Sequence, residues 1–173
     1  KDSGLDIRAE DVETVCREYE HLAKEYVERR KNGQWFNFFH FMIDLEGGPC
    51  VAKRLRGCGS GTEYLAVTPE GELYPCHQFV GRKEFLLGNI YDGLNQNPVR
   101  DTFRNTNVYT KPRCNSCWAK FYCSGGCAAN AWQFNSDIRI PYEIECELEK
   151  KRVECALWIK AQESSRLAGP AEN

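Results

Sequence analysis

The spacing of its cysteines is the feature that most constrains this chain. Ten of the 173 residues are cysteines, and four form one dense run of the pattern C-x2-C-x5-C-x3-C. This run consists of Cys114, Cys117, Cys123 and Cys127. A C-x2-C turn directs two thiolates towards one metal atom or one cluster edge, and the small residues after Cys123 let the backbone approach a cluster sulfide. The run therefore predicts a metal site.

Charge and hydropathy indicate which partners and which cellular compartment to expect. The formal net charge is −2 with 28% charged residues. The sequence thus shows neither the excess of basic residues typical of nucleic-acid-binding proteins nor a basic patch for a membrane surface. No run of about 18 apolar residues occurs and no leader opens the chain, so we expect a cytoplasmic protein without a membrane partner. In a reducing compartment, clustered cysteines bind metal more often than they form disulfides. A short basic cluster, Lys53, Arg54 and Arg56, could offset the charge of thiolate ligands.

Hydrophobic patterning predicts an α+β fold: a small irregular domain with a β-hairpin and cluster-binding loops, between an N-terminal helix and a long C-terminal helix. Apolar residues at steps of three and four predict the first helix over residues 10–31. The apolar run at 35–45 must be buried against something. Alternation around Thr68-Pro69-Glu70-Gly71 predicts a hairpin between residues 64 and 74. A short helix is expected at 98–105, and the long helix from Pro141, with Ile144, Leu148, Val153, Leu157, Trp158 and Ala161 on its apolar side.

Two other readings of the cysteines stay open at this point. A zinc ribbon would need two C-x2-C pairs, and this chain has one. Structural disulfides conflict with the reducing compartment. A zinc-stabilised module without a redox duty remains an alternative to an iron–sulfur protein.

The order of the cysteines resembles the SPASM domain of radical S-adenosylmethionine (SAM) peptide-modifying enzymes. Cys58, twelve residues, Gly71, four residues and Cys76 precede the dense run, and Cys146 follows it. The segments at 35–45, Gly47-Gly48-Pro49-Cys50 and 74–79 further resemble maturases that install thioether links in small cysteine-rich peptides of the SCIFF type (six cysteines in forty-five residues). The resemblance extends from residue 35 to residue 149.

The resemblance implies two auxiliary [4Fe–4S] clusters. Cys58, Cys76 and Cys127 would bind the first, while Cys114, Cys117, Cys123 and Cys146 would bind the second. Cys127 thus belongs to the dense run but serves the other cluster, as happens in two-cluster ferredoxins. The ligands of the two clusters are therefore expected to cross along the sequence.

Four further side chains have expected roles outside these two ligand sets. Cys50 is the fourth ligand of the first cluster, a ligand that substrate displaces, or a loop cysteine. His77 adjoins Cys76 and could donate a hydrogen bond beyond the ligands. Cys16 and Cys155 are expected to pack as small hydrophobic residues.

The resemblance implies a function as well. The chain would be the auxiliary-cluster region of a maturase that links a cysteine sulfur to an α-carbon of a ribosomally made cysteine-rich precursor peptide. Its clusters would bind the substrate thiolate and pass electrons, and an electron donor such as ferredoxin or flavodoxin would be a partner. The C-x3-C-x2-C loop that binds S-adenosylmethionine through a third [4Fe–4S] cluster is absent, because Asn130 stands where its last cysteine would be. We therefore expect a fragment that is inactive alone.

These expectations define three segments and several alternatives. Residues 1–45 would end, or lead from, the radical SAM barrel, 46–165 would form the SPASM domain, and 166–173 would be a disordered tail. The alternative functions are another SPASM maturase, forming formylglycine or a carbon–carbon link, and a non-catalytic electron-transfer or zinc-binding module.

Overall fold

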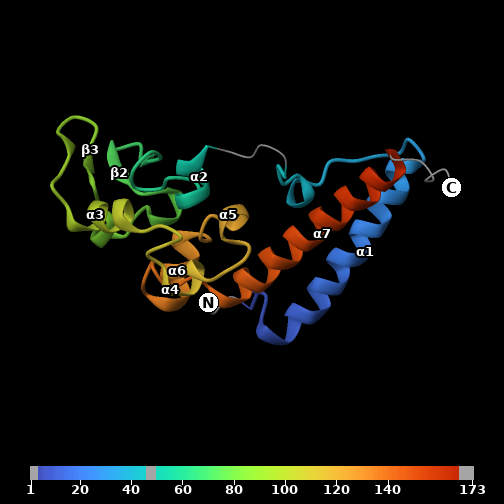
Figure 1. Cartoon of the computed structure of the whole chain (residues 1–173). Coiled ribbons are helices and arrows are strands. Elements are labelled where there is room, and N and C mark those ends of the chain that lie inside the picture. The colour runs from blue at the N-terminus through green and yellow to red at the C-terminus, as the bar shows by residue number, and fades with distance from the viewer. Residues whose placement is uncertain (1–3, 46–49, 168–173) are drawn as a thin grey trace. The chain divides into compact units, whose positions relative to one another are not determined.

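The computed structural model describes residues 4–45 and 50–167, which form two compact units (Figure 1). The cysteine-rich unit spans residues 50–142, and the helical unit combines the chain before residue 50 with the chain from residue 143. Helices flank a small antiparallel sheet, so the predicted α+β class is confirmed. Among the described residues, no helix has the length and apolar character needed to cross a membrane.

Two long helices build the helical unit. A 3-10 turn, η1 (Ala9–Asp11), leads into α1 (Val12–Lys31), and α7 (Glu143–Leu167) lies alongside it (Figure 1). The helices run parallel, because ion pairs join Lys151 to Glu20 at 2.7 Å and Glu163 to Arg30 at 3.1 Å. The predicted helix over residues 10–31 is thus confirmed, and just after its last residue the Gly33 N–H donates to the Arg30 carbonyl at 3.3 Å.

The buried face of α7 differs in part from the predicted apolar side. Leu148 and Val153 are buried as expected, whereas Leu157 and Trp158 are exposed. In their place Cys155, Ala156 and Ile159 are buried, and Cys155 and Ile159 pack in a cluster with Ala23, Tyr26 and Val27 of α1. The burial of Cys155 confirms its expected packing, whereas Ala156 and Ile159 were not placed on the predicted apolar side. The prediction assigned Trp158 to the buried face because its ring is large and apolar, but this residue is exposed.

The aromatic segment after α1 is only half buried. Phe36 and Phe38 are partly buried and Phe41, in the 3-10 turn η2 (Phe39–Phe41), is buried against Tyr19 and Tyr26. Trp35, Phe39 and Met42 are exposed, so the described residues bury only part of the run. An irregular backbone turns alternate side chains outward, so only part of the run reaches α1.

Short elements make up the cysteine-rich unit. They are α2 (Val51–Arg56), β1 (Ala66–Val67), β2 (Glu72–Tyr74), η3 (His77–Phe79), η4 (Lys83–Phe85), β3 (Gly88–Asn89), β4 (Gly93–Leu94), α3 (Pro98–Asn105), α4 (Pro112–Asn115), α5 (Lys120–Cys123) and α6 (Ala128–Asn135). The sheet has the order β1-β2-β3-β4 with every neighbouring pair antiparallel. Its first hairpin is the predicted one, with Ala66 opposite Tyr74 and the Gly71 N–H bonded to the Thr68 carbonyl. The predicted short helix coincides with α3, where Asn97 caps the Val99 N–H.

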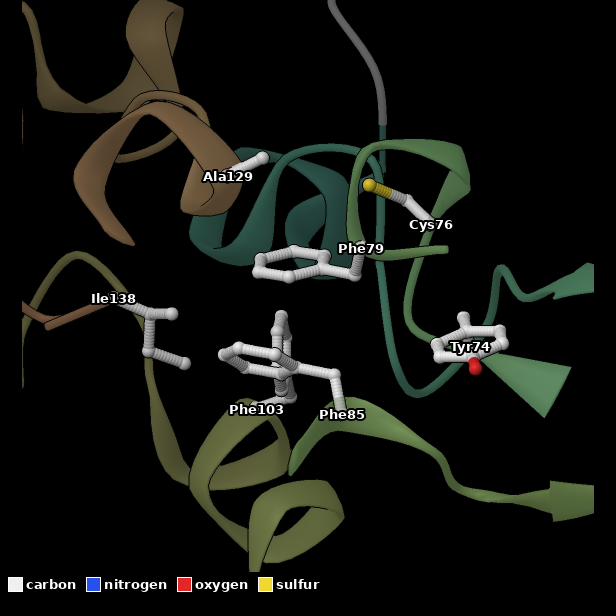
Figure 2. Close-up of a cluster of buried hydrophobic side chains, with 7 residues drawn as sticks. All are labelled: Tyr74, Cys76, Phe79, Phe85, Phe103, Ala129 and Ile138. Atoms are coloured by element: carbon white, nitrogen blue, oxygen red, sulfur yellow. The ribbon is translucent and has the colours of Figure 1, made fainter. Parts of the chain in front are cut away.

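An aromatic cluster forms the core of this unit (Figure 2). The Phe79 ring lies 4.3 Å from that of Phe85 and 5.6 Å from that of Phe103, the second pair edge to face. Tyr74, Cys76, Ala129 and Ile138 complete the buried set, so the 3-10 turns, α3 and α6 meet around three phenylalanines. Aromatic pairs of this kind contribute about 1 kcal/mol each beyond the area they bury.

Changing Gly88 to Ala should destabilise the cysteine-rich unit by about 3 kcal/mol, because the residue combines a positive φ with a backbone clash. Its φ is +144°, and a Cβ would lie 2.2 Å from the Gly93 carbonyl oxygen. Gly93→Ala is the matched control, since its φ is +82° but no atom lies within 4 Å of the added Cβ. Chemical denaturation of both variants measures the difference, and equal losses would contradict the clash.

Two expectations concern residues beyond those described. Residues 46–49 and 168–173, which include the Gly47-Gly48-Pro49 boundary and most of the expected tail at 166–173, lie outside the described residues. Helix α7 itself extends to Leu167. By compactness, residues 143–167 form one unit with α1, through a buried contact that includes Ala23 and Ile159. The expected segments at 1–45 and 46–165 stay predictions.

Candidate metal centre

Cys76 lies at the rim of the aromatic core. It precedes the 3-10 turn η3 and is buried, and in Figure 2 its sulfur points towards the helix that carries Ala129. Burial raises the pKa of the Cys76 thiol, and the nearby thiols of Cys127 and Cys58 raise it further. The backbone amides of Gln78 and Phe79 act in the opposite direction and lower this pKa. A thiolate at this position would thus have two other sulfurs and two amide dipoles nearby.

The turns that carry Cys58 and Cys127 lie close together. Cys58 follows α2, and a Cβ on the preceding Gly57 would come within 3.6 Å of Ser124. Ser124 begins the three-residue loop that ends at Cys127, and Cys127 is the N-terminal cap of α6. The turn after α2 and the loop before α6 are therefore in contact range.

Sequence-distant cysteines thus meet in one region of the cysteine-rich unit. Cys58, Cys76 and Cys127 are the three residues that the resemblance assigned to the first cluster. Cys127 packs against the same core as Cys76, and the side chains of Gln133 and Gln78 join α6 to η3 at 3.3 Å. Thiolates with nearby amide donors are the ligand environment that iron–sulfur clusters use, so the residues present fit such a group.

The second predicted set is brought together only in part. Cys114, buried in α4, and the half-buried Cys117 are neighbours, since the Cys117 N–H donates to the Cys114 carbonyl at 3.0 Å. Burial raises the pKa of the Cys114 thiol, and the Cys117 thiol raises it further. Cys123 ends α5. Cys146 lies on α7 in the helical unit, so its place beside the other three stays a prediction.

A buried lysine belongs to this region, and the sequence reasoning missed it. Lys111 is 4% exposed, and its Nζ donates to the Gly125 carbonyl at 2.6 Å. Together with Arg56 and Cys58 it lines a cavity of about 40 Å³. Its position three residues before Cys114 is the signal in the sequence that could have identified it. The sequence analysis named only the basic cluster that includes Arg56 as a source of positive charge for the thiolates.

Cys50 and His77 are placed without a settled role. Cys50 is the exposed N-terminal cap of α2, and its carbonyl accepts the Arg54 N–H at 3.2 Å. His77 is exposed as the first residue of η3, next to Cys76. Neither placement assigns a ligand, so both roles stay predictions.

Cys155 should resist alkylation in the folded protein. Burial is the first cause that raises the pKa of its thiol, to about 11, and Lys151 opposes the rise. At pH 8 its thiolate fraction is then roughly a hundredfold below that of an ordinary cysteine, so iodoacetamide should react at least that much more slowly. Mass spectrometry of Cys155 in native and urea-unfolded protein measures the ratio, and similar rates in both would contradict the buried packing.

None of the ten cysteines, all of which lie in described residues, forms a disulfide. Across residues 4–45 and 50–167, no three histidine, cysteine or acidic side chains gather closely enough to hold a single metal ion. A [4Fe–4S] cube differs from such an ion because its cysteines bind separate irons, which spaces the sulfurs farther apart.

Comparison with known families supports an iron–sulfur site. Residues 58–118 match the family SPASM, described as an iron-sulfur cluster-binding domain. A search of curated proteins finds no match for the chain. The matched region contains Cys58, Cys76, Cys114 and Cys117 and ends before Cys123, so the later cysteines depend on the spacing and geometry given above. Over residues 58–118 the chain is similar to SPASM iron–sulfur cluster-binding domains.

Proposed function

We propose that this chain is the auxiliary-cluster region of a radical SAM maturase that forms thioether cross-links in a cysteine-rich peptide. The observation that supports the proposal most is the meeting of Cys58, Cys76 and Cys127 within a region whose first part matches SPASM. Cys58 is exposed and Cys76 is buried, so this trio spans from the core of the unit to its surface.

The chain's own residues would hold and orient the reacting groups. The Cys76 thiolate would be anchored by the phenylalanine core, with the Gln78 and Phe79 amides beside its charge. Exposed Cys58 marks the side from which a peptide could approach. When bound there, an iron–sulfur cluster would supply an iron site for a substrate thiolate and an acceptor for one electron.

The proposed reaction balances without another oxidant. The peptide loses one S–H and one C–H bond and gains one S–C bond, a two-electron oxidation. One hydrogen atom goes to a 5′-deoxyadenosyl radical, which a separate S-adenosylmethionine-binding domain makes with one electron from a donor such as ferredoxin or flavodoxin. The thiol proton goes to solvent. The remaining electron leaves through the cysteine-rich unit and replaces the electron that the donor supplied.

A peptide titration tests this proposal. Reconstituted protein receives a short cysteine-containing peptide or its serine counterpart, and Mössbauer spectra are recorded for the native chain and for Cys50→Ala. We expect the cysteine peptide alone to change the spectrum of about one iron in four of the first cluster, with Cys50→Ala resembling the native chain before peptide is added. No response to the cysteine peptide in either protein would contradict thioether formation and favour an electron-transfer module or another SPASM maturase.

A further inference from the structure

The backbone and the side chain of Lys111 connect the two halves of the dense cysteine run. Its carbonyl accepts the N–H of Cys114 at 3.0 Å and of Asn115 at 3.1 Å, so its backbone starts the α4 turn of the C-x2-C half. Its Nζ reaches the Gly125 carbonyl at 2.6 Å, in the loop of the C-x3-C half. One residue thereby fixes both halves against each other.

The loop that Lys111 holds has an unusual backbone. Ser124, Gly125 and Gly126 follow one another with φ values of 60°, 93° and 71°. A Cβ on Gly125 would meet only ordinary contacts, the nearest at 3.5 Å from Val108, so conformation and not space favours glycine there. This loop separates Cys123 of the second predicted set from Cys127 of the first, and its shape determines where both sulfurs lie.

The charge of Lys111 is costly where it lies. An ammonium that is 4% exposed loses most of its hydration, and its hydrogen bond to the Gly125 carbonyl offsets part of that cost. Two cysteines of the predicted ligand sets lie close to it. The Lys111 carbonyl accepts the Cys114 N–H at 3.0 Å, and Lys111 and Cys58 line the same cavity.

We propose that Lys111 is a positioning residue that locks the loop at 124–126 and provides positive charge to both sets of cysteine thiolates. This inference rests on the proposed iron–sulfur function. Reduction adds negative charge to a thiolate-bound centre, so a buried cation nearby favours the reduced state and raises the reduction potential. Arg56, on the wall of the same cavity, adds charge of the same sign near Cys58.

Substitutions at Lys111 separate its hydrogen bond from its charge. Lys111→Met removes both, Lys111→Gln keeps a donor without the charge, and Lys111→Arg keeps the charge. The matched control is Lys120→Met, because Lys120 also donates to a backbone carbonyl at 2.6 Å but is only partly buried. Iron and sulfide content and the midpoint potentials are measured for each reconstituted chain by redox titration followed by EPR.

We expect the Gln and Met variants to lower a midpoint potential by about 59 mV or more, which is a tenfold change in a one-electron equilibrium. The Lys111→Arg variant should keep the native midpoint potentials. Lys120→Met should change the one-electron reduction equilibrium constant by less than about twofold. Should the Lys111→Met chain bind no iron, the other two variants decide the question. Iron that is bound by Lys111→Arg but not by Lys111→Gln supports the role of the charge. Native iron content and potentials in both Met and Gln variants would overturn the inference. A native chain without iron and sulfide would instead defeat the proposed function itself.

Discussion

Replacing Cys127 with serine should remove about half of the iron, roughly four of about eight atoms per reconstituted chain. The physical reason is that Cys127 is placed with Cys76 and Cys58, although its nearest cysteine along the sequence is Cys123. Iron and sulfide analysis with EPR of the reduced protein gives the measurement. The remaining signal should match that of Cys58→Ser and differ from that of Cys123→Ser.

The control for this experiment is Cys16→Ser, a half-buried cysteine on α1 in the helical unit, which should leave the iron content unchanged. If Cys127→Ser and Cys123→Ser lose the same signal, the ligands do not cross between sets and the grouping of Cys127 with Cys76 is wrong.

Removing the metal should unfold the cysteine-rich unit while α1 and α7 persist. The strands there have two or three residues and α4 and α5 have four each, too short to be stable without tertiary support. Its aromatic core centres on three phenylalanines. Structural metals contribute on the order of 10 kcal/mol in small domains, which is comparable to the whole stability of such a unit.

Hydrogen exchange measured by mass spectrometry resolves the two units in one experiment. In the metal-free chain, amides of residues 50–142 should exchange at nearly unprotected rates, while those of α1 and α7 keep protection through their packed faces. Reconstitution should restore protection in residues 50–142. A metal-free chain with a cooperative transition and full protection in that range would contradict a metal-dependent fold.

Local sequence signals predicted the elements whose stability is local. The α1 pattern, the short helix α3 and the turn at Gly71 each depend on residues within a few positions, and each is present. The face of α7 was predicted less well, because Ala156 is buried for its fit against α1 whereas the larger Leu157 and Trp158 are exposed. The exposed side chains at Trp35 and Phe39 likewise depend on an irregular backbone that no periodicity encodes.

In the candidate site, too, features that depend on tertiary contacts were the hardest to predict from the sequence. The assignment of Cys127 to the same cluster as Cys58 and Cys76 came from resemblance, and it stays a prediction. In the structure, the Cys127 and Cys58 thiols lie near enough to Cys76 to raise its pKa, after the larger effect of burial. Lys111 was not predicted, because a lysine beside a proline and an arginine looks like a solvated turn until the fold closes over it. Its role depends on the contact with Gly125, fourteen residues away, which has no sequence signature.

Anaerobic quantitation of iron and sulfide with Mössbauer spectroscopy on the reconstituted native chain tests the central claim most directly. The account predicts about eight irons and eight sulfides per chain, with the spectrum of [4Fe–4S] clusters. Zinc bound without sulfide would contradict it.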